Sequence, residues 1–263
     1  MSKVIVEGSF DNIGARDLRF LEEAAKFGGV TVLLWPDSVA RAKTGKEPRF
    51  PYAERCYFLR ATRYVAAVLE WLDDDAALPP DATLWVERKT FADSAREHFC
   101  RERGLDYRLI APRDLNGFPV GAPMPSGGKK VVVTGCYDWF HSGHVRFFEE
   151  AAAFGDLYVV VGNDANIRQL KGEGHPLIAQ DERRYIVGSI KYVTQAQIAT
   201  GEGWLDADPQ IRILKPDYYV VNEDGDKGGK REYCEANGIA YTVLKREPAP
   251  GMPRRSSTDL RGF

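Results

Sequence analysis

The hydrophobic pattern of the chain alternates between short, nearly continuous apolar runs and apolar stripes with helical spacing. The stripes are formed by Val145, Phe148 and Ala152, and further on by Ile186, Val187 and Ile190. The runs lie at 131–133, 157–161, 218–221 and 241–244. Such runs are typical of parallel strands buried on both faces. Strands that alternate with helices predict an α/β fold with parallel sheets flanked by helices.

The connection between the first of these strands and the first helix is the expected binding site. Ligands of open parallel sheets bind beyond the carboxyl ends of the strands. The loop at 135–144 stands at such an end. At the far end of the helix we expect Gly155 in the C′ position, where glycine is favoured because it adopts a left-handed conformation without strain.

The whole pattern occurs twice along the chain. Residues 4–37 align with 131–164 at a constant offset of 127 and without a gap, and 14 of the 34 aligned residues are identical. The similarity continues from Glu54 to Tyr57 against Glu182 to Tyr185. This period is too long for a solenoid. The sequence therefore predicts two tandem Rossmann-like domains.

A shift in composition marks the boundary between the two copies. Residues 111–130 carry four prolines and four glycines. Such a segment cannot hold a regular hydrogen-bond ladder and is typical of a linker. We expect a first domain at 1–112, a linker at 113–128 and a second domain at 129–263.

Composition and charge narrow the class of protein. The chain of 263 residues is 44% apolar and 28% charged, and its formal net charge is −2. This balance is that of an ordinary globular protein and gives no basic surface for nucleic acid or for a membrane. No apolar run approaches the ~18–20 residues that span a bilayer, and the first residues lack a signal-peptide core. We expect a cytoplasmic protein without membrane insertion.

The four cysteines do not indicate a metal centre or a disulfide framework. Cys56, Cys100, Cys136 and Cys234 are scattered and form no CxxC pair. In a reduced compartment this spacing gives neither a structural zinc site nor a disulfide scaffold. We therefore expect no metal bound by side chains alone.

The loop from Gly135 to His144 carries the strongest candidate chemistry. A helix N-terminus offers free N–H groups and a partial positive charge, which together form an anion site. His141 and His144 stand three residues apart there, so both could donate to one phosphate. Donors placed where charge develops would stabilise an in-line phosphoryl transition state. The alternatives are a capping or packing pair and, with a third ligand nearby, a metal pair.

The string Gly135-Cys136-Tyr137-Asp138-Trp-Phe-His141-Ser-Gly-His144 resembles the signature of the cytidylyltransferase-like nucleotidyltransferase superfamily. A second motif of that superfamily, a Ser/Thr-rich segment that opens the last helix, resembles the run from Arg255 to Arg261. The two motifs lie in the order found in the superfamily, at the two ends of the second copy. The resemblance covers that copy over its whole length and the first copy in degenerate form.

The resemblance implies roles for individual residues. His141 and His144 match the histidines that contact the nucleotide phosphates and stabilise the transition state, and Lys171 matches a catalytic lysine that bridges the triphosphate and the incoming phosphate. The remaining nucleotide-binding positions are Gly135, Cys136, Tyr137 and Asp138 in the first motif, Arg183 and Lys191 between the motifs, and Ser257, Thr258 and Arg261 in the second.

Several of these positions have a plainer interpretation. Lys171 could be a solvated surface lysine, Arg183 and Lys191 could form salt bridges on helices, and the Ser-Thr segment could be a simple helix N-cap. The chain also departs from the superfamily pattern. The arginine expected just before the second motif has no clear equivalent in the run 245–255. An acidic loop at 222–227 could hold a metal or an amine-bearing acceptor, or form a solvated turn.

The first copy lacks the signature. Gly14 stands opposite His141 and Asp17 stands opposite His144, and a carboxylate there repels phosphate. We expect an inactive domain that pairs with the second as an intramolecular pseudo-dimer. Tandem domains also occur in the phosphoethanolamine cytidylyltransferases of the superfamily.

The expected function is transfer of the NMP part of an NTP to a phosphorylated small alcohol, with release of pyrophosphate. The resemblance favours CTP as the nucleotide, phosphoethanolamine or glycerol phosphate as the acceptor, and Mg²⁺ on the triphosphate. The alternatives are an adenylyltransferase that uses ATP and a sugar phosphate of the heptose-phosphate kind, and a non-catalytic nucleotide-binding regulator.

Overall fold

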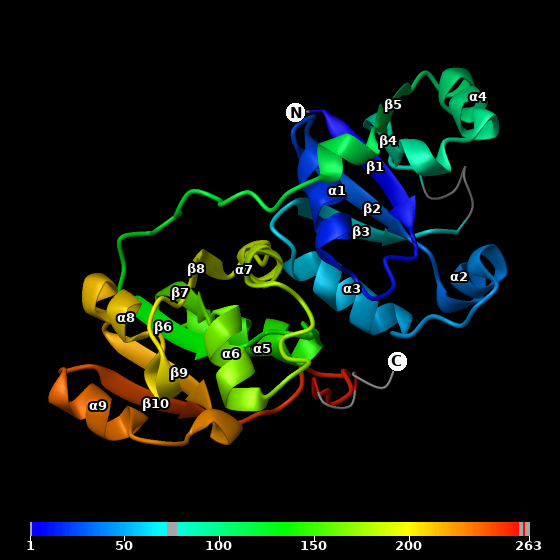
Figure 1. Ribbon diagram of the computed structural model, residues 1–263. Helices are drawn as coiled ribbons and strands as arrows, with labels where there is room; N and C mark the ends of the chain where they lie inside the picture. Colours follow the sequence, from blue (N-terminus) through cyan, green and yellow to red (C-terminus); the bar gives the residue numbers. More distant parts are fainter. Residues whose placement is uncertain (1, 73–77, 258–259, 261–263) are drawn as a thin grey trace. The chain divides into compact units, whose positions relative to one another are not determined.

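The protein is described here by a computed structural model that covers residues 2–72, 78–257 and 260. The chain divides into two compact units, Met1–Phe118 and Pro119–Phe263 (Figure 1). Each unit is a five-stranded sheet with helices packed around it. The prediction of two tandem α/β domains with parallel sheets is therefore confirmed.

The first unit alternates strands and helices in the order β1 (Lys3–Gly8), α1 (Ala15–Ala25), β2 (Gly29–Leu34), α2 (Asp37–Thr44), α3 (Tyr52–Ala61), β3 (Val65–Glu70), β4 (Ala82–Arg88), α4 (Ser94–Glu102) and β5 (Asp106–Ile110). Short 3-10 turns follow β4 at Lys89–Phe91 and β5 at Pro112–Leu115.

The second unit repeats this order with β6 (Lys130–Gly135), α5 (Ser142–Ala152), β7 (Asp156–Val161), α6 (Asp164–Lys171), α7 (Gln180–Gly188), β8 (Val193–Ile198), α8 (Asp208–Leu214), β9 (Tyr218–Asn222), α9 (Lys230–Ala236) and β10 (Ala240–Leu244). Its 3-10 turns lie at Gly203–Leu205 and Glu223–Gly225. Helix α8, between β8 and β9, has no equivalent among the described residues of the first unit.

The two sheets have the same strand order and register. The order is β3-β2-β1-β4-β5 in the first sheet and β8-β7-β6-β9-β10 in the second, and every pairing is parallel. Gly8 pairs with Leu34 as Gly135 pairs with Val161, so the pairings keep the sequence offset of 127. The carboxyl ends of β1 and β6 therefore lie at equivalent edges, where open α/β sheets bind ligands.

The central strands are buried on both faces, as their apolar runs predict. Val4, Ile5 and Val6 of β1 have no exposed surface, and neither do the three valines of β6 at 131–133. On α5, Val145 and Phe148 of the predicted stripe are fully buried against the second sheet. This packing fixes the direction of the loop that leaves each central strand.

The segment expected to be a linker, 113–128, makes contacts with the unit on each side of it. The turn at Pro112–Leu115 packs on α1, where Leu115 is buried and the Asp114 carbonyl accepts a hydrogen bond from Arg19. Further on, the Ser126 and Gly127 N–H groups donate to the Asp156 carboxylate. The prolines and glycines do exclude regular strands here, but they leave the backbone free to pack. The division between the units falls at 118/119.

Gly155 does not occupy the expected C′ position. Helix α5 ends at Ala152, its cap is Ala153, and Gly155 follows two residues later with φ 149°. A Cβ atom there would lie 2.1 Å from the Lys129 carbonyl oxygen. Glycine is needed because two backbone segments meet, and Gly28 meets Ser2 in the same way in the first unit.

In the part of the chain that the structure describes, no helix is long and apolar enough to cross a membrane. All four cysteines are free thiols, and Cys136 is the most accessible of them.

Candidate functional site

Two stacked histidine rings lie at the N-terminus of α5, beyond the carboxyl end of β6. His141 is the N-cap residue, and its Nδ1 accepts a hydrogen bond of 3.1 Å from the Gly143 N–H. The centroids of the His141 and His144 rings are 4.0 Å apart, and His144 also stacks on Phe140 at 5.3 Å. The histidines thus cap and pack, as their plainer interpretation holds. They also stand beside the N–H groups at the start of α5.

The backbone before the histidines turns sharply because of one residue in the left-handed region. Tyr137 has φ 54°, and its ring folds back over Gly135. The ring makes edge contacts with His144 and Phe148, both at 5.3 Å. Burial raises the pKa of Tyr137 above its usual value, so this side chain stays neutral. The Tyr137 ring therefore packs against His144 of the histidine pair.

A methyl group at Gly135 would disturb this packing. The Cβ atom of Gly135→Ala would lie 2.7 Å from Cζ of Tyr137. We expect a loss of about 1–3 kcal/mol in unfolding free energy, because an overpacked core forces ring or backbone shifts. Urea denaturation measures this loss. Gly121→Ala is the matched control, since no atom lies within 4 Å of its Cβ position. Equal stability of the two variants would contradict the account.

Asp138 and Arg183 make hydrogen bonds that hold the loop in place. The Asp138 carboxylate accepts hydrogen bonds from the Leu177 and Ile178 N–H groups. Arg183 has no exposed surface, and its guanidinium donates to three backbone carbonyls and to the Asp164 carboxylate. The carbonyls belong to Cys136, Gly162 and Ile178. We assign both residues a positioning role.

The first unit contains the same two anchors, although it lacks both histidines. Asp11 accepts hydrogen bonds from the N–H groups of Arg49 and Phe50. Arg55 donates to the carbonyls of Ser9, Trp35 and Phe50 and to the Asp37 carboxylate. Since these contacts persist where the signature is gone, they serve the fold of the loop.

The C-terminal segment reaches the histidine loop, so the two sequence motifs meet in space. The Ser257 hydroxyl donates to the Trp139 carbonyl at 3.1 Å. The Arg255 carbonyl oxygen lies 3.8 Å from the Cβ position of Gly143. Thr258 and Arg261, the other two predicted residues of this motif, lie outside the described residues.

Arg246 is a candidate residue to which the sequence reasoning gave no role. It follows β10, and its guanidinium donates to Asp224 and to the Arg255 carbonyl. With Gly143, Arg146, Lys245 and Arg255 it lines a small pocket at the start of α5. Its place after a parallel strand was the signal available in the sequence, because such positions face the ligand edge.

The charges around His144 set its protonation state. Burial lowers the pKa of His144 well below its usual value, and electrostatic interactions with His141, Arg246 and Lys171 lower it further. Lys171 is exposed at the last position of α6, and its charge reaches His144. At neutral pH His144 is therefore an uncharged imidazole in a positive environment, which is suited to an anion.

This lowered pKa gives a prediction for stability. The unfolded chain binds a proton at position 144 near pH 6.5, whereas the folded protein does so only at lower pH. Stability should therefore fall as the pH drops below about 6.5, by at most ~1.4 kcal/mol per pH unit for this one group. Urea midpoints between pH 7 and 5 should show a shallower decline for His144→Asn than for wild type. An unchanged slope in the variant would refute this assignment.

The other predicted residues lie in different surroundings. Cys136 is partly exposed on the loop, and its carbonyl is bound by Arg183. Lys191 is exposed, two residues before β8 begins, with its amine 5.3 Å from the Tyr192 ring centroid. That position is the amino end of the strand, opposite the edge that carries the histidines. The structure does not bring Lys191 to the site.

Comparison with known proteins places this site in a family. The family model described as "Cytidylyltransferase-like" matches residues 132–263. A bifunctional protein HldE from Geobacter sulfurreducens is 51% identical over 115 residues, which cover 42% of this chain and 23% of that protein. An FAD synthase from Methanospirillum hungatei is 34% identical over 134 residues, which cover 50% of this chain and 82% of that protein.

A second HldE protein, from Aliarcobacter butzleri, is 37% identical over 113 residues, which cover 42% of this chain and 23% of that protein. The chain thus spans about a quarter of the length of these HldE relatives.

Proposed function

The chain belongs to the cytidylyltransferase-like family of nucleotidyltransferases, and from this premise we propose that its second unit transfers the AMP part of ATP to a phosphorylated small molecule. Pyrophosphate is the second product. The observation that carries the proposal is the stacked pair His141 and His144 at the start of α5, with the cationic groups Arg246 and Lys171 acting on it.

Adenylyl transfer is favoured over the cytidylyl transfer expected from the sequence because of the relatives. The FAD synthase, as its name states, makes an adenine dinucleotide, and this chain covers most of its length. The tandem arrangement of domains favoured CTP only by resemblance. CTP remains the second candidate, and the acceptor is a sugar phosphate of the heptose-phosphate kind or another phosphate ester.

The proposed reaction is a direct in-line displacement. An oxygen of the acceptor phosphate forms a bond to the α-phosphorus while the bond from that phosphorus to the bridging oxygen of the β-phosphate breaks. The electron pair leaves with pyrophosphate. Since the acceptor phosphate is already an anion, no general base is required. Positioning and charge stabilisation then supply the rate.

The residues of the second unit have distinct tasks in this scheme. The His141 and His144 rings donate to oxygens on the reacting phosphates, and the N–H groups at the start of α5 add fixed partial charge. Lys171 and Arg246 hold the rest of the triphosphate, together with Ser257, Thr258 and Arg261. The negative triphosphate raises the pKa of His144, so nucleotide binding promotes proton uptake there.

A magnesium ion would come with the nucleotide. In the ranges 2–72 and 78–257 no three His, Cys, Asp or Glu side chains are grouped as a metal site. This fits an ion that is held through phosphate oxygens, as Mg²⁺ usually is at such sites. When bound, it neutralises charge on the triphosphate.

A panel of substrates tests the proposal. Pyrophosphate release is measured with Mg²⁺ and either ATP or CTP, against sugar 1-phosphates, FMN, glycerol phosphate and phosphoethanolamine. We expect one acceptor to give release with ATP and at least tenfold less with CTP. Preference for CTP would restore the cytidylyl alternative. Tight nucleotide binding without release for any acceptor would instead support a non-catalytic regulator.

A further inference from the structure

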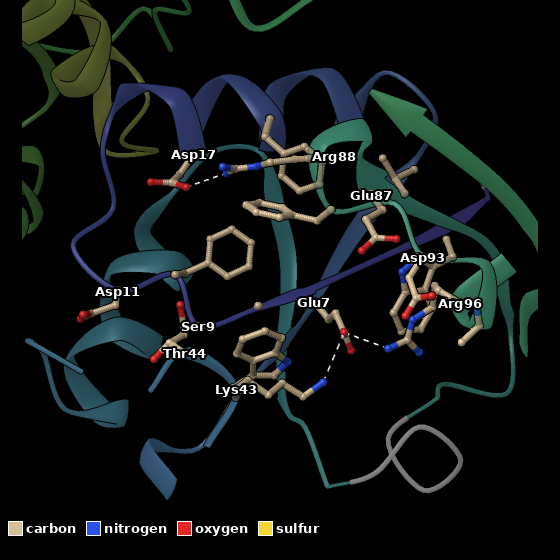
Figure 2. A pocket seen from close by; sticks show the side chains of 18 of the residues that line it. Glu7, Ser9, Asp11, Asp17, Lys43, Thr44, Glu87, Arg88, Asp93 and Arg96 are labelled. Carbon is tan, nitrogen blue, oxygen red and sulfur yellow. Dashed lines mark hydrogen bonds and ion pairs between the residues drawn. The ribbon is translucent and has the colours of Figure 1, made fainter. Parts of the chain in front are cut away.

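The first unit contains a large pocket at the edge that corresponds to the histidine site of the second. It has a volume of about 800 Å³ and lies at the carboxyl ends of β1, β2 and β4 (Figure 2). Its walls combine aromatic rings, among them those of Trp35, Trp85 and Phe91, with charged side chains. The edge without the histidine signature therefore carries a cavity of the size that small-molecule sites have.

The N-terminus of α1 and the nearby Arg88, which could bind a phosphate, already contact a carboxylate of the chain itself. Asp17 stands in the first turn of α1, where its carboxylate accepts a hydrogen bond of 2.9 Å from the Gly14 N–H. The same carboxylate pairs with Arg88 at 2.5 Å. The Asp17 carboxylate thus binds the N–H group at the start of α1 and also neutralises Arg88. A phosphate at this position would be repelled by the negative charge of Asp17.

The other charged side chains of the pocket are also engaged in ion pairs or hydrogen bonds. Glu7 pairs with Arg96 at 2.8 Å and with Lys43 at 3.8 Å. Figure 2 shows these two pairs and the pair of Asp17 with Arg88 on the pocket wall. Glu87 accepts a hydrogen bond from the Tyr107 hydroxyl, and burial raises its pKa. The three cations of the pocket are thus paired with Glu7 and Asp17, and Glu87 is bound by a hydroxyl.

The two remaining acids of the pocket, Asp11 and Asp93, are bound by backbone N–H groups. The pocket is thus lined by five carboxylates and three cations, and this excess of negative charge repels a phosphate.

The indole rings of Trp35 and Trp85 line the pocket, whereas their Nε1 atoms are buried. Among the described residues, the Nε1 atoms of Trp35 and Trp85 have no hydrogen-bond acceptor, and Trp85 has no exposed surface. Buried donors are usually satisfied. Phe91, by contrast, is 66% exposed where it lines the pocket, so its ring is free to stack on a ligand.

We propose that this pocket binds an uncharged, hydroxyl-bearing ring compound and discriminates against its phosphate ester. Carboxylates and guanidinium groups hydrogen-bond to hydroxyls, the rings of Trp35 and Trp85 give apolar wall surface, and the exposed Phe91 stacks on the face of the ligand's ring. A nucleoside and a free sugar share this chemistry. The site lies in the unit without the histidine signature, so it does not depend on the proposed transferase activity.

Fluorine NMR of the full chain labelled with 5-fluorotryptophan locates the binding. The five tryptophans give five signals, assigned by single Trp→Phe variants. Trp35 and Trp85 report on the pocket, whereas Trp139 reports on the histidine loop of the second unit. The uncharged probes are adenosine, cytidine and glucose, and each is compared with its phosphate ester, AMP, CMP and glucose 6-phosphate respectively. Adenosine and cytidine test for a nucleoside site, and glucose tests for a sugar site.

We expect at least one uncharged probe to shift the Trp35 and Trp85 signals, and its phosphate ester to bind there about tenfold more weakly. Phe91→Ala should weaken the uncharged probe about tenfold, as loss of an aromatic stacking partner does. Ile213→Ala, at an even more exposed apolar position of the second unit, should have no effect. Asp17→Asn keeps an acceptor for the Gly14 N–H but removes the negative charge. It should therefore reduce the difference in affinity between the uncharged probe and its phosphate ester.

The gain of ester binding in Asp17→Asn cannot arise from unfolding. Three results would overturn the proposal. The Trp35 and Trp85 signals could stay unmoved by every uncharged probe at millimolar concentration, the esters could bind as tightly as the parent compounds, or Phe91→Ala could leave the affinity unchanged.

Discussion

Replacing either histidine of the pair should lower turnover by about 100- to 1000-fold, which is the loss seen when one donor to a developing oxyanion is removed. His141→Asn is the sharper test, because asparagine is also a good N-cap residue and can accept from the Gly143 N–H. A loss of activity then reports on the ring rather than on the helix. The measurement is kcat/KM for pyrophosphate release.

A matched control exists on the surface of the first unit. His98 is exposed on α4 and pairs with Glu102. His98→Asn should leave kcat/KM within about twofold, since a substitution at an exposed surface position usually disturbs the fold little. If His141→Asn retains wild-type turnover while it is fully folded, the pair only caps and packs, and the chemistry lies elsewhere.

Arg183→Lys should destabilise the second unit by about 3–5 kcal/mol, the usual cost of breaking a buried charge network. Lysine cannot reproduce the fork that binds three carbonyls and Asp164 at once. The orphaned carbonyls would then stay buried without partners. Urea unfolding followed by circular dichroism measures the loss.

The first unit supplies the matched variant for this prediction. Arg55→Lys breaks the same set of contacts and should cost a similar free energy, but in the unit without the histidines. Folded Arg55→Lys protein should keep its turnover. If Arg183→Lys instead unfolds like wild type and loses only activity, Arg183 contacts the nucleotide and the positioning role is refuted.

Most of the fold follows from the sequence because the repeat and the apolar runs are local signals. The runs at 131–133 and 157–161 are strands, and the offset of 127 recurs in the strand register. Topology then placed the loop of His141 at the ligand edge. The contact of Ser257 with Trp139 then brings together two motifs that lie at opposite ends of the second copy.

The parts that sequence did not predict depend on contacts between distant residues. An arginine in the sequence can bind either a phosphate or backbone carbonyls, and the sequence does not show that Arg183 is fully buried. Gly155 is required by the close approach of its backbone to Lys129, and helix-capping preferences do not predict such a contact. Arg246 reaches the site through the path of the chain after β10, which periodicity does not specify. The pairing of the two units as a pseudo-dimer and the cytoplasmic location stay predictions.

The central claim is that the second unit transfers a nucleotidyl group, and isotope tracing tests it most directly. The full chain is incubated with Mg²⁺, the active acceptor, and ATP labelled at either the α- or the γ-phosphorus. The account predicts that the α-label enters the acceptor product and that the γ-label leaves in pyrophosphate, with both transfers lost in His141→Asn. Transfer of the γ-label to the acceptor, or release of single phosphate, would contradict it.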